Sequence, residues 1–301
     1  MEIEKIAKIL KLPSTEISEI TVLKKGMTNR SFLFLCKNVK YIIRVPGEGT
    51  TQLIDRYQED AAYKAISGRG ICDAPIYLDP KEGYKITRYL NNVRNCDPHN
   101  VSDLRKCMAK LREFHAMKLR TDYEFDIYQQ INFYESLWEG KPSAYRDYHI
   151  VKEKVWELRE YIKLHIEEKV LAHIDAVPDN FLFCKDQDGN EQLQLIDWEY
   201  AGMQDPHVDI AMFCIYSMYC KKEVDQLIDI YFENCCDDRI RAKIYCYIAS
   251  CGLLWSNWCE YKKSLGVEFG EYALKQYQFA KDYYEYAMKL IGCMDRENRD
   301  V

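Results

Sequence analysis

With 301 residues, 48% of them apolar, the chain is long enough for one large domain or for two lobes with separate cores. Its net charge of −6 argues against the basic surface of a DNA- or RNA-binding protein, and no cluster of Lys and Arg beside an apolar helix indicates a membrane surface. Thirteen cysteines without a Cys-x-x-Cys pair or a secretory leader argue against a disulfide framework or a structural zinc site. The longest apolar run, Ile210 to Cys220, is too short to span a bilayer, so we expect a cytoplasmic protein.

The N-terminal part predicts a helix followed by a small sheet. Residues 2–11 place their apolar side chains on one helical face. Strand-like segments follow at 17–23, 31–36 and 41–45. The turn between the first two contains a single glycine, Gly26, and on its own indicates an ordinary hairpin turn.

Two charged residues stand out in this region. Arg44 lies on the third strand, where it is either a functional cation or an exposed residue of an edge strand. Residues 53–66 predict a helix that contains Glu59. Without further context, Glu59 is a surface residue with a local partner such as Arg56 or Tyr63.

The middle of the chain predicts the end of this sheet and then a series of helices. Short strands near 75–78 and 84–87 complete the sheet, and residues 88–90 mark a crossing to a second lobe. Three helices follow, from Asn100 or Ser102 to Met117, at 127–138 and at 145–165. His115 lies on the apolar stripe of the first of these helices, and we interpret it as a packed core histidine rather than a catalytic one.

The strongest pattern lies between residues 171 and 202. The apolar runs 181–183 and 193–196 flank Asp188-Gly189-Asn190, which is typical of a β-hairpin. His173, Asp175 and Asn180 precede the first strand in the spacing His-x-Asp-x4-Asn, and Asp197 ends the second. In phosphotransferases one aspartate takes the proton from an attacking hydroxyl, while an asparagine and a second aspartate hold magnesium. Each residue alone also fits a cap, a turn or a strand end, but their joint occurrence favours the catalytic interpretation.

Together with Ile196-Asp197-Trp198-Glu199-Tyr200, this motif resembles the choline and ethanolamine kinases, within the wider superfamily of aminoglycoside-phosphotransferase-like kinases. The resemblance implies a protein-kinase-like bilobal α+β fold, with a small N-terminal antiparallel sheet lobe and a larger, mainly helical C-terminal lobe. It divides the chain into a nucleotide-binding lobe, residues 1–90, and a helical lobe with the catalytic loop and the substrate pocket, residues 91–301. The implied cofactors are ATP and Mg²⁺.

The resemblance also implies nucleotide-binding roles in the first lobe. Arg44 takes the place of the strand lysine of protein kinases, and its planar guanidinium can hold phosphate with two hydrogen bonds. Glu59 is expected to pair with that cation, and the backbone of the crossing is expected to contact the adenine edge. The implied residues are Thr28, Asn29, Arg44, Glu59, Arg88, Tyr89 and Leu90.

In the second lobe, the resemblance makes Asp175 the general base, or the residue that orients the substrate hydroxyl. Asn180 and Asp197 become the metal ligands, and His173 braces the loop. Asp209 falls in an Asp-Pro-x-x-Asp element, where it helps to fix the catalytic loop. An aspartate in the first turn of a helix is also favoured by the helix dipole, so Asp209 could be structural only.

The C-terminal third is helical and rich in aromatic residues. A quaternary ammonium group has no N–H to donate and is held best by the faces of aromatic rings. The segments around Trp255 and Phe269 resemble the choline-pocket segments of choline kinases, and Trp258 and Tyr216 are further candidates for this pocket. The alternative is an aromatic stripe that packs helices together.

One position departs from the family pattern. Eukaryotic choline kinases carry an acidic residue where this chain has Tyr216. The candidates for the charge partner of the substrate cation are therefore Asp175 and Glu199.

The function expected from these patterns is the ATP- and Mg²⁺-dependent phosphorylation of a small amino alcohol, with choline the first choice and ethanolamine the second. Phosphorylation of an aminoglycoside or another small molecule is an alternative, although it calls for a pocket lined by carboxylates. A pseudokinase or choline-binding module is the alternative without catalysis. We expect a small-molecule substrate and neither nucleic-acid binding nor membrane insertion, and the sequence leaves the oligomeric state open.

Overall fold

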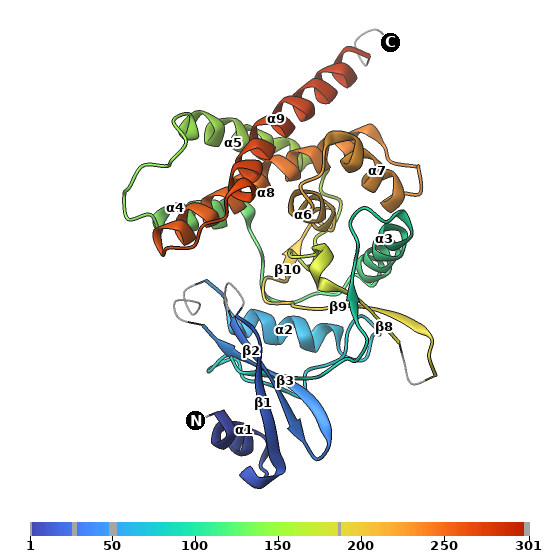
Figure 1. Ribbon diagram of the computed structural model, residues 1–301. Coiled ribbons are helices and arrows are strands. Elements are labelled where there is room, and N and C mark those ends of the chain that lie inside the picture. Colours follow the sequence, from blue (N-terminus) through green and yellow to red (C-terminus); the bar gives the residue numbers. More distant parts are fainter. Residues whose placement is uncertain (1, 26–28, 48–52, 186–187, 298–301) are drawn as a thin grey trace. The chain divides into compact units, whose positions relative to one another are not determined.

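A computed structural model describes residues 2–25, 29–47, 53–185 and 188–297 (Figure 1). The chain forms two compact units. Unit 1 contains residues 1–95, 121–123 and 180–201, and unit 2 contains residues 96–120, 124–179 and 202–301. Among the described helices, none combines the length and the apolar character that crossing a membrane requires.

Unit 1 contains a five-stranded antiparallel sheet in the order β1-β2-β3-β5-β4. On β3 the pleat turns Ile43 into an apolar core shared with Ile6 and Phe34, whereas Arg44 contacts the helix α2. The Asp55 carboxylate caps that helix by accepting hydrogen bonds from the Tyr57 and Gln58 N–H groups, so α2 begins three residues later than expected. These elements are α1 (Glu2–Leu10), β1 (Ile17–Lys25), β2 (Asn29–Cys36), β3 (Val39–Pro46), α2 (Arg56–Ile66), β4 (Tyr77–Leu78) and β5 (Lys85–Arg88).

The expected hairpin is confirmed as β8 (Phe181–Lys185) and β9 (Glu191–Leu195). β8 also pairs with β6 (Arg94–Asn95), and the Leu195 N–H donates to the Ile71 carbonyl at 3.0 Å. Because of these contacts the hairpin belongs to unit 1. The division into lobes of residues 1–90 and 91–301 stays a prediction.

Unit 2 is mainly helical. Asn100 caps its first helix, since the Asn100 side chain accepts a hydrogen bond from the Ser102 N–H at 2.9 Å. A short two-stranded sheet pairs β7 (Val170–Ala172) with β10 (Gly202–Gln204). The helices are α3 (Val101–Ala116), α4 (Ile127–Ser136), α5 (Tyr148–His165), α6 (Val208–Tyr216), α7 (Lys221–Tyr231), α8 (Asp238–Ser264) and α9 (Glu271–Glu297).

The two longest helices, α8 and α9, pack side by side (Figure 1). At their contact, Gly252 of α8 faces the backbone of α9. A Cβ atom at this position would lie 2.7 Å from the Gln276 carbonyl oxygen and 2.9 Å from the Phe279 Cβ. The distance between packed helices depends on the side chains at their contact, and here the absence of one allows the close approach.

Candidate active site

In unit 1, β3 and α2 bring Arg44 and Glu59 together. Arg44 forms an ion pair with Glu59, and its Nη1 lies 3.3 Å from carboxylate oxygens of both Asp197 and Glu199. Arg44 is 6% exposed and Glu59 is fully buried. The structure thus brings the expected pair together and removes Glu59 from the surface.

Two further cations join these residues. Lys85 on β5 lies opposite Arg44 in the strand register, and its Nζ is 3.1 Å from Glu59 and 3.7 Å from Asp197. Arg56 lies 3.4 Å from Glu59 and 3.7 Å from Glu199. Sequence reasoning missed Lys85; the available signal was a lysine within a buried strand, because buried lysines are almost always paired. The charged cluster of unit 1 therefore consists of Arg44, Arg56, Lys85, Glu59, Asp197 and Glu199.

The charged cluster contains three cations and three carboxylates, and its electrostatics differ from one carboxylate to the next. Burial would raise the pKa of Glu59, but attraction by Lys85 and Arg44 outweighs burial and lowers the pKa to about 2. Burial, followed by repulsion from Asp197, raises the pKa of Glu199. Glu59 is therefore held as an anion. Of the two glutamates, Glu199 takes up a proton more readily than Glu59.

The other predicted nucleotide-side residues are engaged within unit 1. The Asn29 amide donates to Glu199 at 2.9 Å and accepts from Arg56 at 3.1 Å. The Tyr89 N–H donates to the Lys40 carbonyl at 3.1 Å, so this amide of the crossing extends the sheet. Thr28 lies outside the described residues. The nucleotide roles of Asn29 and of Arg88, Tyr89 and Leu90 stay predictions.

The predicted metal ligands lie at the same end of the hairpin. Asn180 ends a short 3₁₀ turn (Pro178–Asn180), and its carbonyl oxygen accepts a hydrogen bond from the Ile196 N–H at 2.9 Å. Asp197 follows directly with a φ of +67°, a left-handed conformation that is uncommon for residues other than glycine. Its side chain is 39% exposed even though Arg44 and Lys85 lie beside it. Asp197 is thus oriented by cations and remains accessible.

This donor set fits Mg²⁺. A carboxylate and an amide oxygen are hard ligands, and Mg²⁺ usually takes one or two protein carboxylates together with water and phosphate oxygens. In the described part of the chain, no group of three or more His, Cys, Asp or Glu side chains is arranged to hold a metal. Water and phosphate oxygens would complete the coordination of a metal held by Asn180 and Asp197.

In unit 2, Asp209 fixes the loop that carries Asp175. The backbone N–H groups of His173 and Ile174 donate to the two carboxylate oxygens of Asp209, at 2.9 and 2.7 Å. Ile174 has a φ of +67°, which a β-branched residue adopts only where its surroundings force it. Asp175 is half-buried and follows this strained residue. The position of Asp175 is therefore set by backbone bonds to α6.

His115 supports the same loop from α3. Its Nε2 lies 2.9 Å from Asp209 Oδ2, and its Nδ1 lies 2.8 Å from the Tyr231 hydroxyl. His115 is 6% exposed, as a core histidine would be. The contact between this buried histidine and Asp209 could not be predicted, because the two residues are far apart along the chain.

The aromatic candidates of unit 2 lie together in a row. The distance between ring centroids is 5.4 Å from Trp255 to Trp258, 5.1 Å from Trp258 to Phe269, 6.4 Å from Phe269 to Tyr272 and 6.2 Å from Tyr272 to Tyr216. We call these five residues the aromatic row. Tyr272 belongs to the segment around Phe269 that resembles a choline-pocket segment, but the sequence analysis did not name it as a candidate pocket residue. The structure brings Trp255, Trp258, Phe269 and Tyr216 together, and their substrate-binding role stays a prediction.

Glu199 is not part of this row. It is 5% exposed and belongs to the charged cluster of unit 1, where it contacts Asn29, Arg44 and Arg56. Its predicted contact with the substrate stays a prediction.

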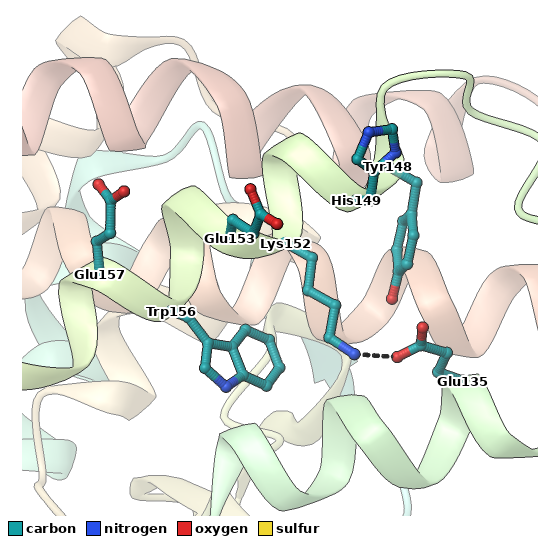
Figure 2. A pocket seen from close by; sticks show the side chains of 7 residues that line it. All are labelled: Glu135, Tyr148, His149, Lys152, Glu153, Trp156 and Glu157. Atoms are coloured by element: carbon teal, nitrogen blue, oxygen red, sulfur yellow. Dashed lines mark hydrogen bonds and ion pairs between the residues drawn. The ribbon is translucent and has the colours of Figure 1, made fainter.

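Unit 2 also contains a separate pocket of about 580 Å³ over α4 and α5 (Figure 2). Lys152 reaches from α5 to Glu135 on α4, with which it forms an ion pair, and its Nζ lies 5.0 Å from the ring centroid of Trp156. The Trp156 ring thus already has a protein cation beside it. The pocket is lined by Glu135, Tyr148, His149, Lys152, Glu153, Trp156 and Glu157, and it contains no predicted site residue.

Comparisons with known proteins point in the same direction as the motif. The family model for choline/ethanolamine kinase matches residues 20–248. Protein LicA of Haemophilus influenzae is 29% identical over 272 residues, covering 83% of this chain and 96% of that protein. The crystal structure of the choline kinase LicA from Streptococcus pneumoniae is 28% identical with a TM-score of 0.78, covering 94% of this chain and 97% of that chain. A crystal structure of LicA in complex with AMP is 29% identical with a TM-score of 0.77, covering 94% and 98%.

The expected protein-kinase-like α+β fold is confirmed by these structural neighbours, together with the antiparallel sheet of unit 1 and the helices of unit 2.

Proposed function

The chain belongs to the choline/ethanolamine kinase family and is a phosphotransferase with an alcohol group as acceptor, and we propose that it transfers the γ-phosphoryl group of ATP to choline in the presence of Mg²⁺. Ethanolamine is the second candidate acceptor. The structure of LicA bound to AMP supports an adenine nucleotide as the donor.

One observation carries the choice of choline, namely the aromatic row in the same unit as Asp175. Ring faces attract a quaternary ammonium group without hydrogen bonds, by about 2 kcal/mol for a desolvated contact. Tyr216, at one end of the row, donates a hydrogen bond at 2.7 Å to Asp179, which follows Asp175 by four residues in the same loop. This proximity supports an acceptor that carries a cation and a hydroxyl a few bonds apart.

In the proposed reaction, Asp175 accepts a hydrogen bond from the substrate hydroxyl. The hydroxyl oxygen attacks the γ-phosphorus, its proton passes to Asp175, and the bond from the γ-phosphorus to the bridging oxygen breaks, so that ADP leaves. The transition state of phosphoryl transfer is loose, so the position of Asp175 contributes more than its basicity. The hydrogen bonds from His173 and Ile174 to Asp209 supply that positioning.

On the nucleotide side, Arg44 contacts the phosphates and Glu59 holds the guanidinium in place. The ion pair between these residues supports this assignment, since an arginine fixed by a buried carboxylate needs little reorganisation to bind phosphate. Asn180 and Asp197 hold Mg²⁺, which when bound neutralises charge on the phosphate oxygens.

A coupled assay for ADP release tests the proposal, with choline, ethanolamine or kanamycin as acceptor and a reaction without acceptor as control. We expect the highest kcat/KM for choline and no turnover when EDTA removes Mg²⁺. Exclusive turnover of ethanolamine would reassign the substrate within the family. Exclusive turnover of kanamycin would contradict the proposal.

A further inference from the structure

The aromatic row alone does not explain how a cationic alcohol would be chosen over a neutral one, because ring faces also bind apolar groups. A carboxylate near the rings would provide that choice, and the sequence left Asp175 or Glu199 for this role. Asp175 is assigned to the substrate hydroxyl. Glu199 lies 3.3 Å from Arg44 and 3.7 Å from Arg56, and these cations already compensate its charge.

The structure places another carboxylate at one end of the aromatic row. Asp179 lies in the turn Pro178–Asn180 and is exposed, and its Oδ2 accepts a hydrogen bond from the Tyr216 hydroxyl at 2.7 Å. Tyr216 is the last ring of the row, 6.2 Å from Tyr272. The carboxylate is thereby held against the edge of the ring surface.

The hydroxyl of Tyr216 is the donor in this contact. Burial, followed by the hydrogen bond to Asp179, raises the pKa of Tyr216 above its ordinary value. The phenol therefore donates its proton to the hydrogen bond, and the Asp179 carboxylate is the acceptor. Tyr216 occupies the position where the family pattern has an acidic residue. Here it orients the carboxylate of another residue, Asp179.

We propose that Asp179, held by Tyr216, is the specificity-determining carboxylate that selects a cationic alcohol at the aromatic row. This inference rests on the proposed function and deepens it. The ring faces attract the head group, and Asp179 discriminates by charge. A carboxylate interacts favourably with an ammonium group and has no comparable interaction with a neutral group of the same shape.

Two substrate alcohols of the same shape but different charge can distinguish the contribution of the rings from that of Asp179. Choline is compared with its neutral carbon isostere, in which a tert-butyl group replaces the trimethylammonium group. For Asp179→Asn we expect the KM for choline to rise about tenfold to a hundredfold, which corresponds to about 1.4–2.8 kcal/mol. The KM for the neutral alcohol, the KM for ATP and the dependence on Mg²⁺ should stay as in the wild type.

Two further variants refine the result. Tyr216→Phe keeps the ring and the carboxylate but removes the hydrogen bond, so the KM for choline should rise in the same direction by a smaller factor. Asp179→Glu keeps the charge and should restore much of the preference for choline over the isostere. These variants keep the inference testable if Asp179→Asn fails to fold.

Asp238→Asn is the matched control. It removes one negative charge from the exposed start of α8, about 25 Å along the helix from Trp255 at 1.5 Å per residue. The KM for choline should not change in this variant.

Three outcomes would overturn the inference or its premise, and they can be told apart. If Asp179→Asn raises the KM equally for choline and for the isostere, Asp179 does not discriminate between a cationic and a neutral acceptor. If it lowers kcat and requires more Mg²⁺, Asp179 serves the neighbouring Asn180 instead. If the wild-type enzyme phosphorylates neither choline nor ethanolamine, the proposed function itself fails.

Discussion

Unit 1 and unit 2 carry the candidate site residues in contrasting ways. The charged cluster of unit 1 contains six ionisable side chains that pair with one another, all of them buried except Asp197, so each cation is fixed by a carboxylate. The aromatic row of unit 2 consists of rings with one exposed carboxylate, Asp179, at its end. Buried charges are costly unless they are paired, whereas ring faces are buried at no such cost. The contrast suits anionic phosphates in the one unit and an organic cation in the other.

The sharpest test of this contrast is Asp175→Asn. A positioned general base contributes about 10²–10⁴-fold to the rate, so we expect kcat to fall by that factor. Nucleotide affinity should hardly change, because the charged cluster of unit 1 is left intact. Steady-state kinetics and calorimetric titration with ATP and Mg²⁺ provide the two measurements, with Asp238→Asn as control. Activity within twofold of the wild type would contradict the role given to Asp175.

Glu59→Gln breaks the charged cluster itself. Removing one partner of a buried ion pair leaves an uncompensated charge and costs about 3–5 kcal/mol, so the free energy of unfolding should fall by that amount. The matched control is Glu285→Gln, which removes an exposed pair with Lys154 and should cost less than about 1 kcal/mol. Chemical denaturation measures both variants. Equal effects would show that burial does not strengthen the pairing at Glu59.

The pH dependence of stability gives a related prediction. The pKa of Glu59 is about 2 in the folded protein, compared with an ordinary value of 4.5. A carboxyl group with a lowered pKa contributes stability that is present above its unfolded value and is lost as the pH falls. The stability difference between the wild type and Glu59→Gln should therefore shrink as the pH falls from 4.5 towards 2. A constant difference over this range, measured by urea unfolding, would contradict the lowered pKa.

The smallest expected effect belongs to the aromatic row. Phe269→Leu replaces a half-buried ring by an aliphatic side chain, so the KM for choline should rise about threefold to tenfold, or about 1 kcal/mol, with kcat unchanged. Phe232→Leu is the matched control, since Phe232 is half-buried at the end of α7 and outside the row. If both variants behave alike, the row packs helices and does not bind the substrate.

The sequence predicted the parts of the fold that depend on neighbours along the chain. The hairpin β8–β9 follows from two apolar runs around Asp188-Gly189-Asn190, and α3 follows from an apolar stripe with Asn100 as its cap. The motif residues could likewise be identified from their spacing.

The sequence did not predict contacts between residues that are far apart along the chain. Lys85 meets Glu59 because β5 pairs with β3, and Tyr216 meets Asp179 because α6 and the turn before β8 come together in the fold. The charged residues of a sequence indicate which ion pairs are possible, but they do not indicate which of these pairs form in the fold. Glu199 illustrates this limit, since the sequence did not indicate that it lies 3.3 Å from Arg44.

Gly252 illustrates how a residue without functional groups can influence recognition. It sits where α8 and α9 approach each other, α8 carries Trp255 and Trp258, and α9 carries Tyr272. A Cβ atom at position 252 would lie within about 3 Å of the α9 backbone, so a larger residue would require a shift of one of these helices. The packing of the two helices that carry these rings thus depends on the absence of a side chain at position 252.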